Sequence, residues 1–138
     1  MTDLEIYLEA MRPSPMEPKR DGKRVDVYPV VNQLKKLGWF GHPAASGGGE
    51  IWSLQNDESN QVKGQRAANN MVKWLKANDY KVREDHKNEV HATNGEVYVS
   101  FGRMFEQNPV TKEFQSRAHI YTKNYMPFKQ MLQRAKLA

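Results

Sequence analysis

Residues 89–101 read EVHATNGEVYVSF, and this stretch decides the fold class. Apolar and polar residues alternate on both sides of Asn94–Gly95, as they do in strands that bury one face. Asn-Gly is a favoured two-residue connection of a β-hairpin because both turn positions require a left-handed backbone. The stretch therefore predicts two antiparallel strands, residues 89–93 and 96–101, which any fold of this chain has to contain.

Three further strands are expected around the hairpin, over residues 50–54, 80–83 and 118–122. Each is short and carries β-branched or aromatic residues in alternation. The polar segments 55–64 and 102–116 are expected to be loops, because they lack any apolar periodicity.

Helical spacing of apolar residues predicts three helices in the same part of the chain. The first is expected between Asp26 as its cap and Gly38 as its end. The second covers residues 65–77, with Asn78 ending it in the left-handed conformation, and the third covers residues 128–135.

This order of elements predicts one α+β domain, with an antiparallel sheet of about four to five strands and the helices packed on one face. A winged-helix arrangement of Gln65–Phe101 is the alternative, because a helix there precedes a hairpin. The globular domain is expected to span residues 25–138. Residues 1–24 are expected to form a short N-terminal helix and then a basic arm that contains Pro13, Pro15 and Pro18.

Composition narrows the class of protein. The chain of 138 residues has no cysteine, which excludes disulfides, thiol catalysis and cysteine-ligated zinc. It contains neither an apolar run long enough for a membrane span nor the pattern of a signal peptide, so a cytoplasmic location is expected. The net charge is +5, and residues 111–138, with six basic residues and one acidic residue, account for all of it.

The clustered charge makes nucleic acid, or a complex that handles it, the leading partner. The basic candidates on the predicted second helix and in the C-terminal region are Arg66, Lys73, Lys76, Arg117, Lys123, Lys129, Arg134 and Lys136. An ordinary solvated helix face has the same composition, so the pattern alone is unspecific. Tyr98 and Tyr121 are expected in the core, with stacking on bases as the alternative.

Two other functions stay open. The first is a protein-interaction inhibitor or adaptor of the kind that bacteriophages encode, with the loop Gly47–Gly48–Gly49 and Phe105 as contact candidates. The glycine loop lacks the spacing of phosphate-binding motifs. The second is a small phosphodiesterase or nuclease that uses His91 and His119 as acid and base.

His91-Ala92-Thr93 resembles one half of the H-x-[ST] pair of two-histidine phosphoesterases, but His119 has no matching Ser or Thr two residues later. His86 and His91 are five residues apart, which fits neither a helical nor a strand pairing of metal ligands. No metal and no cofactor is therefore expected, and the leading interpretation is a non-enzymatic accessory protein.

Overall fold

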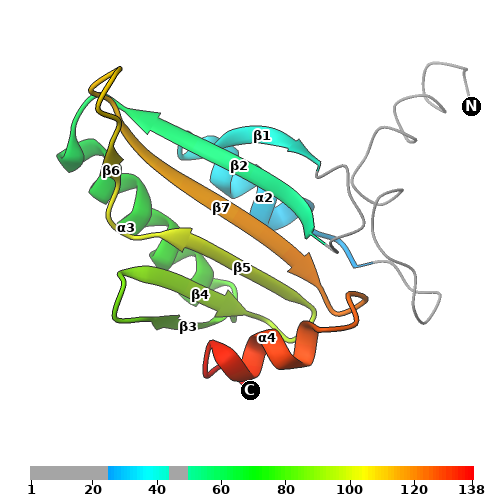
Figure 1. The fold of residues 1–138 in the computed structure, drawn as a ribbon. Coiled ribbons are helices and arrows are strands. Elements are labelled where there is room, and N and C mark those ends of the chain that lie inside the picture. Colours follow the sequence, from blue (N-terminus) through cyan, green and yellow to red (C-terminus); the bar gives the residue numbers. More distant parts are fainter. Residues whose placement is uncertain (1–24, 44–49) are drawn as a thin grey trace, which may run out of the picture.

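The computed structural model describes residues 25–43 and 50–138, which form one α+β domain (Figure 1). Its helices are α2 (Tyr28–Lys36), α3 (Gln61–Ala77) and α4 (Phe128–Arg134). Its strands are β1 (Phe40–Pro43), β2 (Glu50–Glu58), β3 (Lys81–Glu84), β4 (Glu89–Thr93), β5 (Val97–Gly102), β6 (Glu106–Gln107) and β7 (Phe114–Thr122). The predicted N-terminal helix and arm, residues 1–24, lie outside the described residues.

All seven strands belong to one antiparallel sheet with the order β1-β2-β7-β5-β4-β3, and β6 pairs with the start of β7. The predicted class, a single α+β domain with an antiparallel sheet, is confirmed. The sheet has more strands than expected because β1 and β6 are too short and too polar to show alternation. β4 and β5 are inner strands of this sheet, so residues 65–101 do not form a winged helix.

The helices α2 and α3 cover one face of the sheet (Figure 1). Alternation along the inner strands sends Val90, Val99 and Ile120 to this face, where they join one buried cluster with residues of both helices. Trp39 lies in this core, with its ring 5.6 Å from that of Phe101.

The helix α4 lies on the opposite face, which differs from the expectation of helices on one face only (Figure 1). Phe128 and Leu137 pack there on Tyr98 in a second, smaller cluster. Tyr98 lies between Val97 and Val99 in β5, so its side chain points away from theirs. The alternation that builds the main core therefore also supplies an aromatic platform for α4.

Several element ends differ from those predicted. β2 continues through the polar residues 55–58 because Asn56 is fully buried and donates from Nδ2 to the carbonyl of Leu37 at 3.2 Å. α3 begins earlier, where the Asn60 side chain accepts a hydrogen bond from the backbone N–H of Lys63 at 2.9 Å. The left-handed residue after α3 is Asp79 rather than Asn78.

At the start of α2, the N-cap residue is Val27, although Asp26 accepts a hydrogen bond from the N–H of Tyr28. Gly38 ends this helix with a φ of 108°, as expected. Of the helices in the described segments, none is long and apolar enough to cross a membrane.

Candidate functional site

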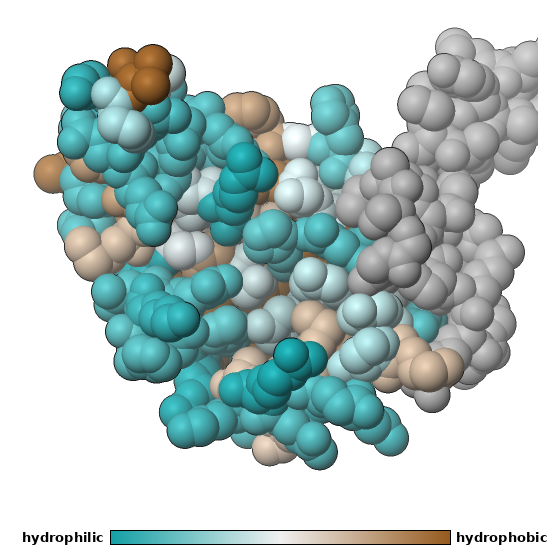
Figure 2. Space-filling model, in the orientation of Figure 1, coloured by the Kyte–Doolittle hydropathy of each residue, from teal (hydrophilic) through white to brown (hydrophobic). Residues whose placement is uncertain are grey.

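The sheet face that carries α4 is lined with polar side chains beyond the area the helix covers. The strand register places His91, Ser100 and His119 side by side across β4, β5 and β7, and continues the row through Ser53 and His42. Figure 2 shows this face, on which hydrophilic surface predominates. A row of hydrogen-bonding groups on an uncovered sheet is a surface that can contact a ligand.

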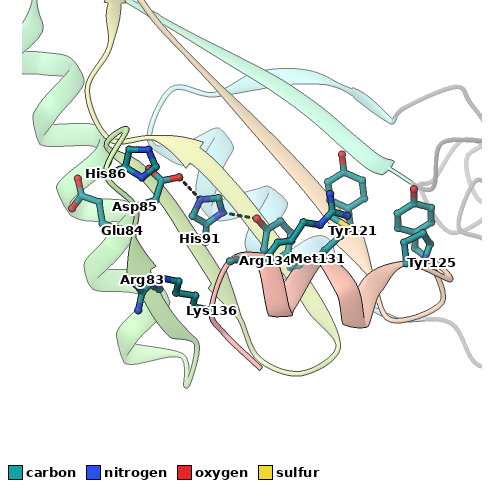
Figure 3. Close-up of a pocket in the computed structure, with 13 residues that line it drawn as sticks. Arg83, Glu84, Asp85, His86, His91, Tyr121, Tyr125, Met131, Arg134 and Lys136 are labelled. Carbon is teal, nitrogen blue, oxygen red and sulfur yellow. Dashed lines mark hydrogen bonds and ion pairs between the residues drawn. The ribbon is translucent and has the colours of Figure 1, made fainter.

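A groove of about 720 Å³ lies where α4 meets this face, between the helix and the turn from β3 to β4. One wall carries Arg83, Glu84, Asp85 and His86, and α4 with the residues after it contributes Met131, Arg134 and Lys136. His91, Tyr121 and Tyr125 also line the groove (Figure 3), together with Tyr98, Pro127 and Ala135. The volume is in the range typical of small-molecule sites, which span roughly 300–1,000 Å³.

His91 is held at both ring nitrogens inside this groove. Its Nε2 is 2.9 Å from Oδ2 of Asp85, and its Nδ1 is 2.5 Å from the hydroxyl of Tyr98 (Figure 3). A neutral imidazole with its hydrogen on Nε2 fits both contacts, because it donates to the carboxylate and accepts from the phenol. The ring is therefore fixed in orientation, with a side-chain exposure of 15 %.

The two partners of His91 have strongly shifted pKa values. The hydrogen bond from His91 and those from the N–H groups of Glu89 and Lys87 lower the pKa of Asp85 to about 2. Burial, and then the charge of Glu89, raise the pKa of Tyr98 to about 12. Asp85 is therefore a carboxylate and Tyr98 a protonated hydroxyl across the physiological range.

Three cations in the groove have no ion-pair partner within the described part of the chain: Arg83, Arg134 and Lys136. Of the two acidic groups of the lining, Glu84 pairs with Arg103 at 3.5 Å, whereas Asp85 is hydrogen-bonded to the neutral ring of His91 and keeps its negative charge, so the three cations outnumber the one unpaired carboxylate of the lining. The groove thus has an excess of uncompensated positive charge that attracts anions.

Tyrosine rings form the other part of the groove. The rings of Tyr121 and Tyr125 stack with a centroid distance of 5.7 Å, and Tyr121 also contacts Tyr98 at 6.1 Å. Tyr98 is 6 % exposed beneath α4, whereas Tyr121 and Tyr125 are both partly exposed. The latter two can therefore offer ring surface to a ligand.

The predicted nucleic-acid residues do not form one surface. Arg134 and Lys136 line the groove, and Lys129 is exposed on α4 beside it. Lys123 pairs with Glu96 at 3.3 Å, and Arg117 lines a second groove of about 790 Å³ near β1.

The α3 candidates, Arg66, Lys73 and Lys76, are exposed on the helix that covers the other face of the sheet. They therefore cannot bind the same short ligand as α4. The helix spacing in the sequence shows each basic face, but it cannot show that the two helices lie on opposite sides of a sheet.

The two histidines proposed as an acid–base pair do share one face, with Ser100 of β5 between them. Two strand spacings separate their backbones by about 10 Å. Each has a ring nitrogen bound to a side chain, because His119 Nδ1 contacts Oε1 of Glu50. The Thr93 hydroxyl donates to the carbonyl of Val97 at 2.7 Å, so it serves the hairpin turn rather than a substrate.

None of the protein-contact candidates lies on a described surface. Gly47, Gly48 and Gly49 lie outside the described residues. Phe105 is 3 % exposed and packs on Trp39 at 5.9 Å, so it belongs to the core and not to a surface tip. The exposed apolar side chains of that loop region are those of Met104 and Val110.

The residues that sequence reasoning missed in the groove include Arg83 and Tyr125. Arg83 lies opposite His91 in the antiparallel register of β3 and β4, so a predicted pairing of these two strands could have indicated it. Nothing in the sequence alone brings Tyr125 to the same place. Comparisons of the chain with protein-family models, with curated proteins and with solved structures find no match.

Proposed function

We propose that this protein binds single-stranded nucleic acid on the open sheet face, with a phosphate in the groove beside α4. The observation that carries the proposal is the set of three uncompensated cations, Arg83, Arg134 and Lys136, around partly exposed tyrosines. Lysine and arginine bind the phosphates, and an aromatic ring stacks on an unpaired base with little regard to sequence.

A single strand fits this site better than a duplex does. Stacking on Tyr121 and Tyr125 requires a base that is not paired, and the groove is lined from several elements rather than by one protruding helix. Further along the face, His119, Ser53 and His42 offer hydrogen-bonding groups, and Arg117 provides another cation. In this proposal the protein is a non-enzymatic accessory protein of the cytoplasm, a compartment that suits a chain without cysteine.

The test compares two double variants with the same change of charge. Arg134→Gln/Lys136→Gln neutralises the groove, whereas Lys73→Gln/Lys76→Gln neutralises the outer face of α3 on the other side of the sheet. Fluorescence anisotropy with labelled single-stranded DNA, single-stranded RNA and duplex DNA is measured across a salt series.

We expect the groove variant to lose affinity. The negative slope of log K against log salt should become less steep by about 1.4, which corresponds to two lost phosphate contacts to a single strand. The α3 variant should bind as the unaltered protein does. Equal losses in both variants would mean that net charge alone governs binding, and no binding by the unaltered protein at low salt would end the proposal.

A second candidate, contact with a protein partner, is favoured by the apolar side chains of Met104 and Val110, which are 48 % and 86 % exposed. In that case Val110→Asp should abolish capture of the partner and leave binding of oligonucleotides unchanged. A partner captured equally well by this variant would remove the support for this surface.

A further inference from the structure

A second kind of site lies at the end of the same groove, in the turn from β3 to β4. Asp85, Glu89 and His91 each offer one ligand atom, and these atoms all lie within 4.8 Å of one another. Glu89 and His91 are two residues apart in β4, so their side chains point to the same face of the sheet. Asp85 directly follows β3 and closes the cluster from the other side of the turn.

The turn itself holds the Asp85 carboxylate in place. Its Oδ1 accepts hydrogen bonds from the backbone N–H groups of Lys87 and Glu89, at 2.8 and 3.0 Å. The other oxygen, Oδ2, is therefore aimed at His91. The cluster is preorganised by backbone hydrogen bonds, which distinguishes it from a chance gathering of mobile surface acids.

We propose that Asp85, Glu89 and His91 bind a divalent transition-metal ion such as Zn²⁺ or Mn²⁺. One imidazole and two carboxylates are a donor set that both ions accept. Two ligand atoms bound tetrahedrally at about 2.1 Å are about 3.4 Å apart. His91 Nε2 and Asp85 Oδ2, now 2.9 Å apart, need to separate only slightly for an ion to replace the hydrogen between them.

Tyr98 supplies the partner that a metal-binding histidine requires at its other nitrogen. When the ion takes Nε2, the neutral imidazole carries its hydrogen on Nδ1 and donates it to the oxygen of Tyr98, which lies 2.5 Å away. Such outer hydrogen bonds fix the ring and typically change metal affinity by about 10–100-fold. Tyr98 is thus a positioning residue for the ion and not a ligand.

Within the cluster, two carboxylates balance the charge of a divalent ion, and three protein ligands leave at least one coordination position open. Arg83, Arg134 and Lys136 line the same groove as Asp85 and His91, so binding of the ion relies on the two carboxylates and the imidazole against the repulsion of these cations. The metal site does not depend on nucleic-acid binding, and it goes beyond the function proposed above.

The chain contains its own control. His119 and Glu50 form a second histidine–carboxylate pair on the same sheet face, but no third ligand completes it among the residues the structure describes. His91 has two carboxylates within ligand distance, whereas the described residues give His119 only one, so only His91 belongs to a three-ligand cluster.

Isothermal titration of the full chain with ZnCl₂, in the absence of nucleic acid, tests the proposal. We expect one equivalent to bind, Glu89→Gln and Asp85→Asn to weaken binding at least about tenfold, and Tyr98→Phe to weaken it by about 10–100-fold. His119→Gln should bind as tightly as the unaltered protein. Circular dichroism checks that each variant is folded.

A second measurement does not depend on any variant. Added Mn²⁺ should broaden the amide NMR signals of residues 85–91 before those of residues 50–54. The proposal is overturned if the unaltered protein binds no stoichiometric ion, if His119→Gln weakens binding as much as Glu89→Gln, or if the broadening centres elsewhere. Loss of oligonucleotide binding in Arg134→Gln/Lys136→Gln with metal binding intact would show that the two sites are separate.

Discussion

Gly64→Ala should destabilise this protein, although alanine is normally the better helix residue. Gly64 lies inside α3, where replacing glycine by alanine stabilises a helix by about 1 kcal/mol. A Cβ atom at this position, however, would lie 2.7 and 2.8 Å from the Cγ and Cδ2 atoms of Phe105. Two hydrogen bonds between the Gln61 side chain and the Phe105 backbone prevent the ring from moving away freely.

The expected size follows from these opposing effects. Overpacking of a buried site costs about 1–3 kcal/mol, and its middle value exceeds the helix gain by about 1 kcal/mol. Urea unfolding should therefore show Gly64→Ala to be less stable by about 1 kcal/mol, with a Tm lower by about 4 °C. In the Phe105→Ala background the clash is absent, and the same change should stabilise the protein by about 1 kcal/mol.

The reversal of sign, a coupling of about 2 kcal/mol, is the decisive result. If Gly64→Ala stabilises the unaltered protein, the Phe105 ring does not pack on α3. Phe105 would then again be a candidate for contact with a partner. If the effect is the same in both backgrounds, the loss has a cause other than this contact.

Three further outcomes are expected. Tyr121→Ala should weaken binding of single strands by about 1–3 kcal/mol without changing the salt slope, which anisotropy across a salt series measures, because a stacked ring carries no charge. Burial and the nearby charge of Asp26 raise the pKa of Tyr80 to about 12, from 10.0, so the contribution of Tyr80 to folding stability should be constant below pH 10 and be lost as the pH rises from 10 to 12. Urea unfolding should show a smaller fall in Tyr80→Phe. Gly38→Ala should cost more stability than Gly95→Ala in thermal unfolding, since both glycines have positive φ but only Gly38 has side-chain atoms, of Asn56 and Glu58, 3.1 Å from an added Cβ.

The fold could be predicted from sequence as far as local patterns decide it. The two hairpin strands and the apolar stripe of α4 formed as expected, because alternation and helical spacing are properties of neighbouring residues. The predicted two-residue turn was wrong, because Thr93 pairs with Tyr98 and only Gly95 of the Asn94–Gly95 pair has a positive φ. The Asn94 side chain accepts hydrogen bonds from the N–H groups of Glu96 and Val97, which stabilises a longer connection. The polar half of β2 was missed because Asn56 is buried against the carbonyl of Leu37, nineteen residues away in the chain. From sequence, a polar segment of this kind is predicted to be a loop, because its hydrogen-bond partner far along the chain is not known.

The candidate site was less predictable, because its residues come together through contacts between segments that are distant in the chain. Charge alone indicates Arg134 and Lys136, which do line the groove, but it indicates Lys73 and Lys76 equally, and these lie on the helix at the opposite side of the sheet. A short motif, one half of an H-x-[ST] pair, indicates His91, whereas its hydrogen-bond partners, Asp85 and Tyr98, come from a turn and a neighbouring strand. Which residues meet depends on the strand order, and no short motif records it.

The position of β7 explains why the groove forms where it does. β7 is a central strand, paired with β2 on one side and β5 on the other, so the chain leaves the sheet from its middle. The helix that follows must lie across one face, and Tyr98 of β5 provides the apolar surface that receives Phe128. Because α4 has only seven residues, it covers part of that face and leaves the groove beside the turn from β3 to β4 uncovered. Arg134 and Lys136, at the end of α4 and after it, therefore line a groove together with Asp85 of the turn and His91 of β4. The groove is thus a consequence of following a central strand of an antiparallel sheet with a short amphipathic helix.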